Sequence, residues 1–120
     1  MATIFIRDLL LRTEVGFNEH ELGKKQDLLL NLTIHYELEG EQVSDDPRKA
    51  LDYRSLCKTI VDMVEESRYN LLEAIANRVV EFLMSIPRIQ KVEVTVDKPH
   101  ALRFSRSVAL SISDQRIVKS

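Results

Sequence analysis

The chain has 120 residues, enough for one hydrophobic core and too few for two, so we expect a single domain over residues 1–120. Its net charge of -2 carries no basic excess, so neither a nucleic-acid-binding nor a membrane-binding protein is expected. The single cysteine, Cys57, excludes an internal disulfide, and no apolar leader or run of ~20 apolar residues is present. These features predict a cytoplasmic protein.

Two strands are predicted in the first third of the chain, because apolar and polar residues alternate there with the period of a strand. The first covers residues 4–13 and the second residues 28–38. A polar, turn-like segment over residues 16–25 separates them. Every other side chain of the second strand is apolar, so one face of the predicted sheet is apolar and the other is polar.

Two helices follow a loop at residues 44–47, where the apolar period changes to that of a helix. Asp52 can cap the first helix and Asn70 the second, and Pro87 marks the end of the second. The apolar stripe of the first helix consists of Leu56, Ile60, Met63 and Val64. The apolar stripe of the second consists of Leu72, Ile75, Ala76, Val79 and Leu83.

Two further strands are predicted over residues 91–97 and 107–113, again from alternation. The order ββααββ predicts an α+β domain, in which two helices cover one face of a four-stranded antiparallel sheet. The other face of the sheet is rich in Ser, Thr and Ala. That face is predicted either to be wet or to line the inside of an oligomeric barrel.

Lys98 is the residue that most strongly suggests chemistry. It lies two positions after Val96 and therefore continues the apolar row of its strand, and Pro99 favours an extended conformation there. A partly desolvated lysine can exchange protons near neutral pH. The alternative is a lysine that extends its amine to solvent at a strand end, and the pattern alone favours this alternative.

Three other residues have both a functional and a plain structural interpretation. Glu73 falls in the first turn of the second helix, where it could accept two adjacent N–H donors of a ligand or only complement the helix dipole. Glu21 lies in a charged loop and is expected to be solvated. Tyr53 opens the first helix and is expected to be partly buried. For each residue, the pattern alone favours the structural interpretation.

No metal or cofactor site is predicted. His20, His35 and His100 are too scattered in the sequence for a zinc site, and the glycines form no phosphate-binding loop. Cys57 lies within a helical turn without an evident activating base, so a thiol nucleophile is not expected. The residue patterns by themselves therefore predict an α+β domain with one unusual lysine and no defined reaction.

Four segments resemble the dihydroneopterin aldolase family. They are residues 15–16 followed by Glu21 and Gln26, the Ala-Leu-Asp-Tyr segment 50–53, the Arg-Tyr-Asn-Leu-Leu-Glu segment 68–73, and the Val-Thr-Val-Asp-Lys-Pro segment 94–99. These segments are spread over nearly the whole chain. Each is short, but their order and spacing taken together are specific for the family.

Within that family, the chain resembles the branch of dihydroneopterin triphosphate epimerases. Aldolases typically follow the lysine with a Pro-Gly-Ala type loop, whereas residues 98–104 here read Lys-Pro-His-Ala-Leu-Arg-Phe. The segments 51–54 and 33–36 favour the same branch.

The resemblance implies a T-fold, in which four strands and two helices per subunit assemble into a ring. Family members form tetrameric rings, and two rings commonly stack into an octamer. The resemblance also implies that a small dihydropterin substrate binds between neighbouring subunits. The small polar residues on the second sheet face would then form the inner wall of the barrel.

The resemblance also assigns roles to residues of this chain. Glu73, together with Leu72, matches the part of the family site that binds the pterin through its 2-amino group and ring N–H. Lys98 matches the lysine involved in proton transfer. Tyr53 matches a catalytic tyrosine that reaches the site from the neighbouring subunit and assists proton transfer to and from the substrate hydroxyls. Glu21 matches the loop glutamate near the substrate side chain.

A substrate triphosphate needs cations, and two pairs of basic residues are candidates. Arg103 and Arg106 follow Lys98, and Lys24 and Lys25 follow the Glu21 loop. We predict that these side chains contact phosphate, although solvated surface charges are an equally good interpretation.

The implied reaction is the epimerisation of 7,8-dihydroneopterin triphosphate at C2′ by a retro-aldol and aldol sequence, without metal or cofactor. The nearest alternative is an aldolase of folate synthesis, which produces 6-hydroxymethyl-7,8-dihydropterin and glycolaldehyde. A non-catalytic ring that binds a pterin or purine is a further alternative, but it would not need Lys98 and Tyr53. The histidine spacing disfavours a zinc-dependent pterin synthase on the same general fold.

Overall fold

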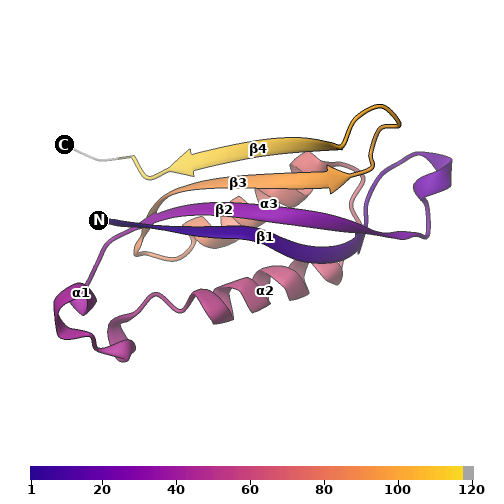
Figure 1. Cartoon of the computed structure of the whole chain (residues 1–120). Helices are drawn as coiled ribbons and strands as arrows, with labels where there is room; N and C mark the ends of the chain where they lie inside the picture. Colours follow the sequence, from indigo (N-terminus) through magenta and orange to yellow (C-terminus); the bar gives the residue numbers. More distant parts are fainter. Residues whose placement is uncertain (118–120) are drawn as a thin grey trace.

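The computed structural model describes residues 1–117 and shows one four-stranded sheet with two main helices (Figure 1). In chain order the strands and helices are β1 (Ala2–Glu14), η1 (Glu19–Glu21), β2 (Lys25–Tyr36), α1 (Glu41–Ser44), η2 (Pro47–Lys49), α2 (Tyr53–Glu65), α3 (Leu72–Met84), β3 (Ile89–Pro99) and β4 (Ser107–Gln115). The predicted order ββααββ is confirmed, with three short helical turns added.

The strands lie in the order β1-β2-β3-β4, and each pair of neighbours is antiparallel. Helices α2 and α3 pack on one face of this sheet, as the pattern predicted (Figure 1). The alternation of β2 is visible in its burial, because every second side chain from Leu28 to Tyr36 enters the core and the intervening ones, Leu29 included, remain partly exposed. The fully buried core includes Leu30, Ile60, Ile75 and Val94, one from each of four elements.

Three local predictions need correction. Strand β2 starts at Lys25 rather than residue 28 and ends at Tyr36 rather than residue 38, and the other three strands each extend one or two residues beyond a predicted end. The predicted loop at residues 44–47 contains the end of α1 and the start of η2. Asn70 does not cap α3, because Leu71 occupies the N-cap position and the Asn70 amide oxygen accepts a hydrogen bond from Arg68 Nη1 at 2.8 Å. Asp52 does cap α2, since its Oδ1 accepts from Ser55 N at 3.0 Å.

Both edges of the sheet carry unpaired backbone groups. Strand β1 has 13 residues and β4 has nine, and within residues 1–117 each pairs with a strand on one side only. The register of β1 shifts between Ile6 and Leu9, where Asp8 has a positive φ of 56°. Long open edges favour pairing with another chain, so the sheet has two sites for strand addition.

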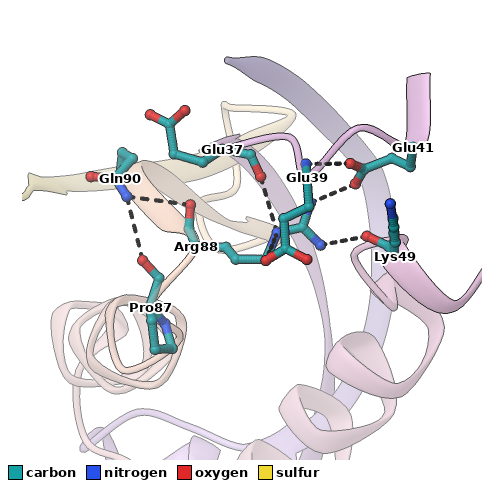
Figure 2. A network of polar contacts seen from close by, with 7 residues as sticks. All are labelled: Glu37, Glu39, Glu41, Lys49, Pro87, Arg88 and Gln90. Carbon is teal, nitrogen blue, oxygen red and sulfur yellow. Dashed lines mark hydrogen bonds and ion pairs between the residues drawn. The ribbon is translucent and has the colours of Figure 1, made fainter. Parts of the chain in front are cut away.

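The connection between β2 and α2 is held by a network around Arg88 (Figure 2). The Arg88 guanidinium donates to Glu37 O at 3.0 Å, to Lys49 O at 2.7 Å and to the Glu41 carboxylate at 2.5 Å. It also lies 5.5 Å from the centre of the Tyr36 ring. The Arg88 side chain, just before β3, therefore holds the segment before α1 at Glu37 and the segment after α1 at Lys49. The second of these segments precedes α2.

No helix within residues 1–117 has the length and apolar character needed to cross a bilayer.

Candidate active site

An ion pair between Lys98 and Glu21 lies where the β1–β2 connection meets the end of β3. The Lys98 side chain is 14% exposed and projects from the same face as Val96, as strand parity predicted. Glu21 is the last residue of the short helical turn η1, and its carboxylate contacts the Lys98 amine. The alternative in which Lys98 extends freely into solvent is therefore wrong.

Glu21 is buried, contrary to the expectation of a solvated loop residue. Its carboxylate accepts hydrogen bonds from Lys98 Nζ, from Asn18 Nδ2 at 3.0 Å and from Gln26 Nε2 at 3.3 Å. The loop prediction was wrong because η1 folds the segment back onto the end of the sheet, where three donors replace water around the carboxylate.

These donors hold the Glu21 carboxylate in its charged form. The hydrogen bond from Lys98 is the largest cause that lowers its pKa from 4.5 to about 2, with smaller contributions from Gln26 and Asn18, while burial opposes the shift. Because the folded-state pKa lies below the unfolded one, the group stabilises the fold fully above pH 4.5. This stabilisation is lost as the pH falls from 4.5 towards 2.

Gly16 leaves the space that the Glu21 carboxylate occupies. Its φ is +117°, and a Cβ added there would overlap the carboxylate. Gly23, in the same connection, has a φ of +74° but would meet nothing closer than Glu14 Oε1 at 3.9 Å. Both glycines thus have a positive φ that favours glycine, but only at Gly16 would a side chain collide with Glu21.

We predict that Gly16→Ala lowers the free energy of unfolding by about 3 kcal/mol and displaces Glu21 from Lys98. Gly23→Ala is the matched control and should cost about 1 kcal/mol, because only the backbone conformation is penalised. Urea unfolding of both variants measures the difference. Equal losses in the two variants would contradict a close approach of Gly16 to Glu21.

A first cavity, of about 200 Å³, extends from the ion pair to the start of α3. Leu72 and Glu73 line it, as do Gly16, Lys98 and the exposed side chain of Leu71. Glu73 lies in the first turn of α3, as predicted, and the N-cap residue offers no side-chain acceptor to the free N–H groups there. A carboxylate beside an apolar wall suits a flat ligand with two adjacent N–H donors.

A second cavity, of about 320 Å³, lies on the other side of the same ion pair. Glu21, Lys98 and Ala101 line both cavities. The other lining residues of the second cavity are His20, Lys24, Lys25, Gln26 and His100. A ligand that passes Lys98 can therefore contact Glu73 with one end and the basic side chains with the other.

Tyr53 is not part of this arrangement within one protomer. It is 55% exposed, so the expectation of partial burial is wrong, and it lies in a separate hollow with Leu51 and Arg54. Tyr53 begins α2, whereas the other end of α2 contacts β1 through the bond from Thr13 Oγ1 to Val64 O at 3.1 Å. The rise of an α-helix separates these two ends by roughly 18 Å, and Figure 1 shows them at opposite ends of the helix layer.

Arg103 and Arg106 lie in the β3–β4 connection and line neither cavity. The Arg103 guanidinium lies 5.3 Å from the centre of the exposed Phe104 ring. Lys24 and Lys25, in contrast, line the second cavity. Sequence reasoning gave no role to Asn18, which donates to Glu21; a polar loop residue three positions from a glutamate carries no signal of that contact.

Within residues 1–117, no group of three or more His, Cys, Asp or Glu side chains is arranged to hold a metal ion. Burial raises the pKa of the Cys57 thiol, which therefore favours its neutral form.

The family model described as dihydroneopterin aldolase (FolB) matches residues 4–113. The chain belongs to the dihydroneopterin aldolase family. The matched range includes every residue that lines the two cavities. The family resemblance found in the sequence is thereby confirmed.

Two relatives in this family carry the name of the epimerase branch. The dihydroneopterin triphosphate 2′-epimerase of Pseudomonas aeruginosa is 43% identical over 97% of this chain and 94% of its own length. The enzyme of the same name from Escherichia coli K12 is 39% identical over 96% of each chain. The dihydroneopterin aldolase of Haemophilus influenzae is more distant, at 28% identity over 93% of this chain and 95% of its own.

Solved structures of the family have the same fold. The structure of E. coli dihydroneopterin aldolase in complex with neopterin has a TM-score of 0.88, is 27% identical and covers 95% of this chain and 99% of that one. The structure of FolB from Vibrio cholerae has a TM-score of 0.90 at 28% identity, covering 97% and 98%. The predicted T-fold subunit is confirmed.

Proposed function

We propose that this protein is a dihydroneopterin triphosphate 2′-epimerase. The observation that carries the proposal is the 43% identity to an epimerase over 97% of the chain, against 28% to an aldolase over a similar length. The buried ion pair of Lys98 and Glu21 between two cavities supports the same proposal, because it supplies a proton-exchanging group beside a space for a flat ligand.

The dihydropterin ring occupies the cavity at the start of α3. The Glu73 carboxylate accepts from the 2-amino group and the ring N–H, two donors that a single carboxylate can bind together. Leu72 and Leu71 contact the ring from the apolar side of this cavity. This orientation directs the side chain of the substrate towards Lys98, because Lys98 lines both cavities whereas Glu73 lines only the first.

The reaction proceeds by breaking and remaking one carbon–carbon bond. A base removes the proton of the C2′ hydroxyl, the C1′–C2′ bond breaks, and the dihydropterin ring takes up the electron pair as an enamine. The aldehyde fragment rotates and the enamine attacks its other face, so that C2′ is inverted and the proton returns to oxygen. Lys98 transfers protons in these steps, and Glu21 holds the Lys98 amine in place.

The active site is completed by a neighbouring subunit. Tyr53 is exposed and lines neither cavity of its own protomer, so it is free to reach the site of a neighbour. The exposed side chains of Phe17 and Leu71 on the wall of the first cavity are suited to cover by another chain. Pairing of the open edges of β1 and β4 would build the ring, as a tetramer or as an octamer of two stacked rings.

The proposal is tested by the products of the pure protein. We expect 7,8-dihydroneopterin triphosphate to yield mainly dihydromonapterin triphosphate, separated and identified by chiral chromatography. The same incubation with unphosphorylated 7,8-dihydroneopterin is the control. Rapid release of 6-hydroxymethyl-7,8-dihydropterin from the control substrate would instead make the protein an aldolase, and no product from either substrate would support a pterin-binding ring.

The single-domain organisation of residues 1–120 and a cytoplasmic location stay predictions that accompany this proposal. The location rests on the single cysteine, which forms no internal disulfide.

A further inference from the structure

We propose that the second cavity is the binding site for the triphosphate of the substrate, with Lys24 and Lys25 as its phosphate-binding residues. This inference rests on the proposed function and deepens it, because it assigns the group that distinguishes the triphosphate from unphosphorylated dihydroneopterin. Lys98 lines this cavity, and Glu73 does not.

The charges that line the cavity favour a polyanion. Three lysines, Lys24, Lys25 and Lys98, face one carboxylate, Glu21. That carboxylate is already bonded by Lys98, Asn18 and Gln26, so it does not neutralise the other two lysines. His20 and His100 add ring nitrogens that can donate to phosphate oxygens.

Two acidic residues on the adjoining strands β1 and β2 are also engaged elsewhere. Glu14 lies opposite Lys25 in the register of β1 and β2, but its carboxylate pairs with Arg68 Nε at 2.6 Å. Asp27 pairs with Arg12 across the same two strands at 3.6 Å. Among the residues that the structure describes, Lys24 and Lys25 take part in no ion pair. Their ammonium groups are therefore available to phosphate.

The order of the two cavities agrees with the order of the groups along the substrate. A ring held by Glu73 places the carbons that react beside Lys98, and the phosphates follow the last carbon of the side chain. Since Glu21, Lys98 and Ala101 line both cavities, the two spaces adjoin at the point where the side chain must pass. Retention of the phosphorylated fragment after bond cleavage would favour its re-addition, and hence epimerisation over release.

The test compares two double variants that lose the same charge. Lys24→Ala with Lys25→Ala should raise the KM for the triphosphate about tenfold or more and leave the KM for unphosphorylated dihydroneopterin unchanged. Lys58→Ala with Lys91→Ala removes two exposed lysines outside both cavities and should change either KM less than about twofold. Equal effects of the two double variants, or equal shifts for the two substrates, would overturn the proposal.

Inorganic tripolyphosphate separates this inference from the proposed function. It should bind the wild-type protein in calorimetry and bind the Lys24 and Lys25 double variant about tenfold more weakly. If the wild-type protein does not convert the triphosphate but this difference persists, the cavity is a polyphosphate site and the epimerase proposal fails. If Arg103→Ala with Arg106→Ala weakens binding and the lysine variant does not, the phosphates bind at the β3–β4 connection and the present assignment is wrong.

Discussion

Replacement of Lys98 by alanine is expected to reduce kcat for epimerisation by about a thousandfold, since a positioned proton-transfer group contributes roughly a hundredfold to ten-thousandfold. Binding of the pterin ring should change little, because the proposed ring contacts are Glu73, Leu71 and Leu72, which the substitution leaves in place. Steady-state kinetics with 7,8-dihydroneopterin triphosphate and calorimetry with neopterin measure the two effects separately. A variant that keeps most of its turnover would contradict a role for Lys98 in proton transfer.

Lys98→Arg is the control that separates proton transfer from charge. Arginine preserves the pair with Glu21 but does not release a proton near neutral pH, so it should be nearly as inactive as alanine. The two variants should differ in acid unfolding. Arginine keeps the low pKa of Glu21, and stability should fall between pH 4.5 and 2 as in the wild type. Alanine removes the main cause of that low pKa, so its stability should depend less on pH in this range.

Tyr53→Phe is expected to reduce kcat by about a hundredfold through loss of the hydroxyl that exchanges protons with the substrate. The active site that is impaired should be that of the neighbouring subunit, because Tyr53 is proposed to enter that site. Mixing Tyr53→Phe and Lys98→Ala subunits tests this directly. Random assembly should create intact sites at about a quarter of the positions, so activity should recover to about a quarter of the wild-type value.

Recovery requires that the two residues of one site come from different chains. If Tyr53 and Lys98 acted within one protomer, every site of the mixed assembly would lack one of them and activity would stay at the level of the single variants. Mixing each variant with itself under the same conditions controls for gains caused by reassembly alone.

The sequence predicted the features that depend on local periodicity. Alternation fixed the direction of Lys98 relative to Val96, and the apolar stripe of the second helix placed Glu73 in its first turn. The element order ββααββ predicted a four-stranded antiparallel sheet with two helices on one face, and the structure adds the strand order β1-β2-β3-β4.

Features that depend on contacts distant in sequence could not be predicted in this way. The burial of Glu21 requires η1 to fold back onto Lys98, a residue 77 positions later in the chain. Asn70 has the residue type of a helix cap, but its contact with Arg68 and the position of Leu71 exclude that role. Tyr53 has no partner in the cavities of its own chain, so its proposed role depends on a second subunit.

The Arg88 network shares no residue with the linings of the two cavities, yet it holds the segment that precedes α2. Under the proposed assembly, the start of α2 delivers Tyr53 to the site of the next subunit. The Arg88 network of one protomer would then affect the rate at the active site of the neighbouring protomer. In rings that mix wild-type subunits with subunits substituted at Arg88, a site would keep its activity wherever the neighbour that supplies Tyr53 is wild type.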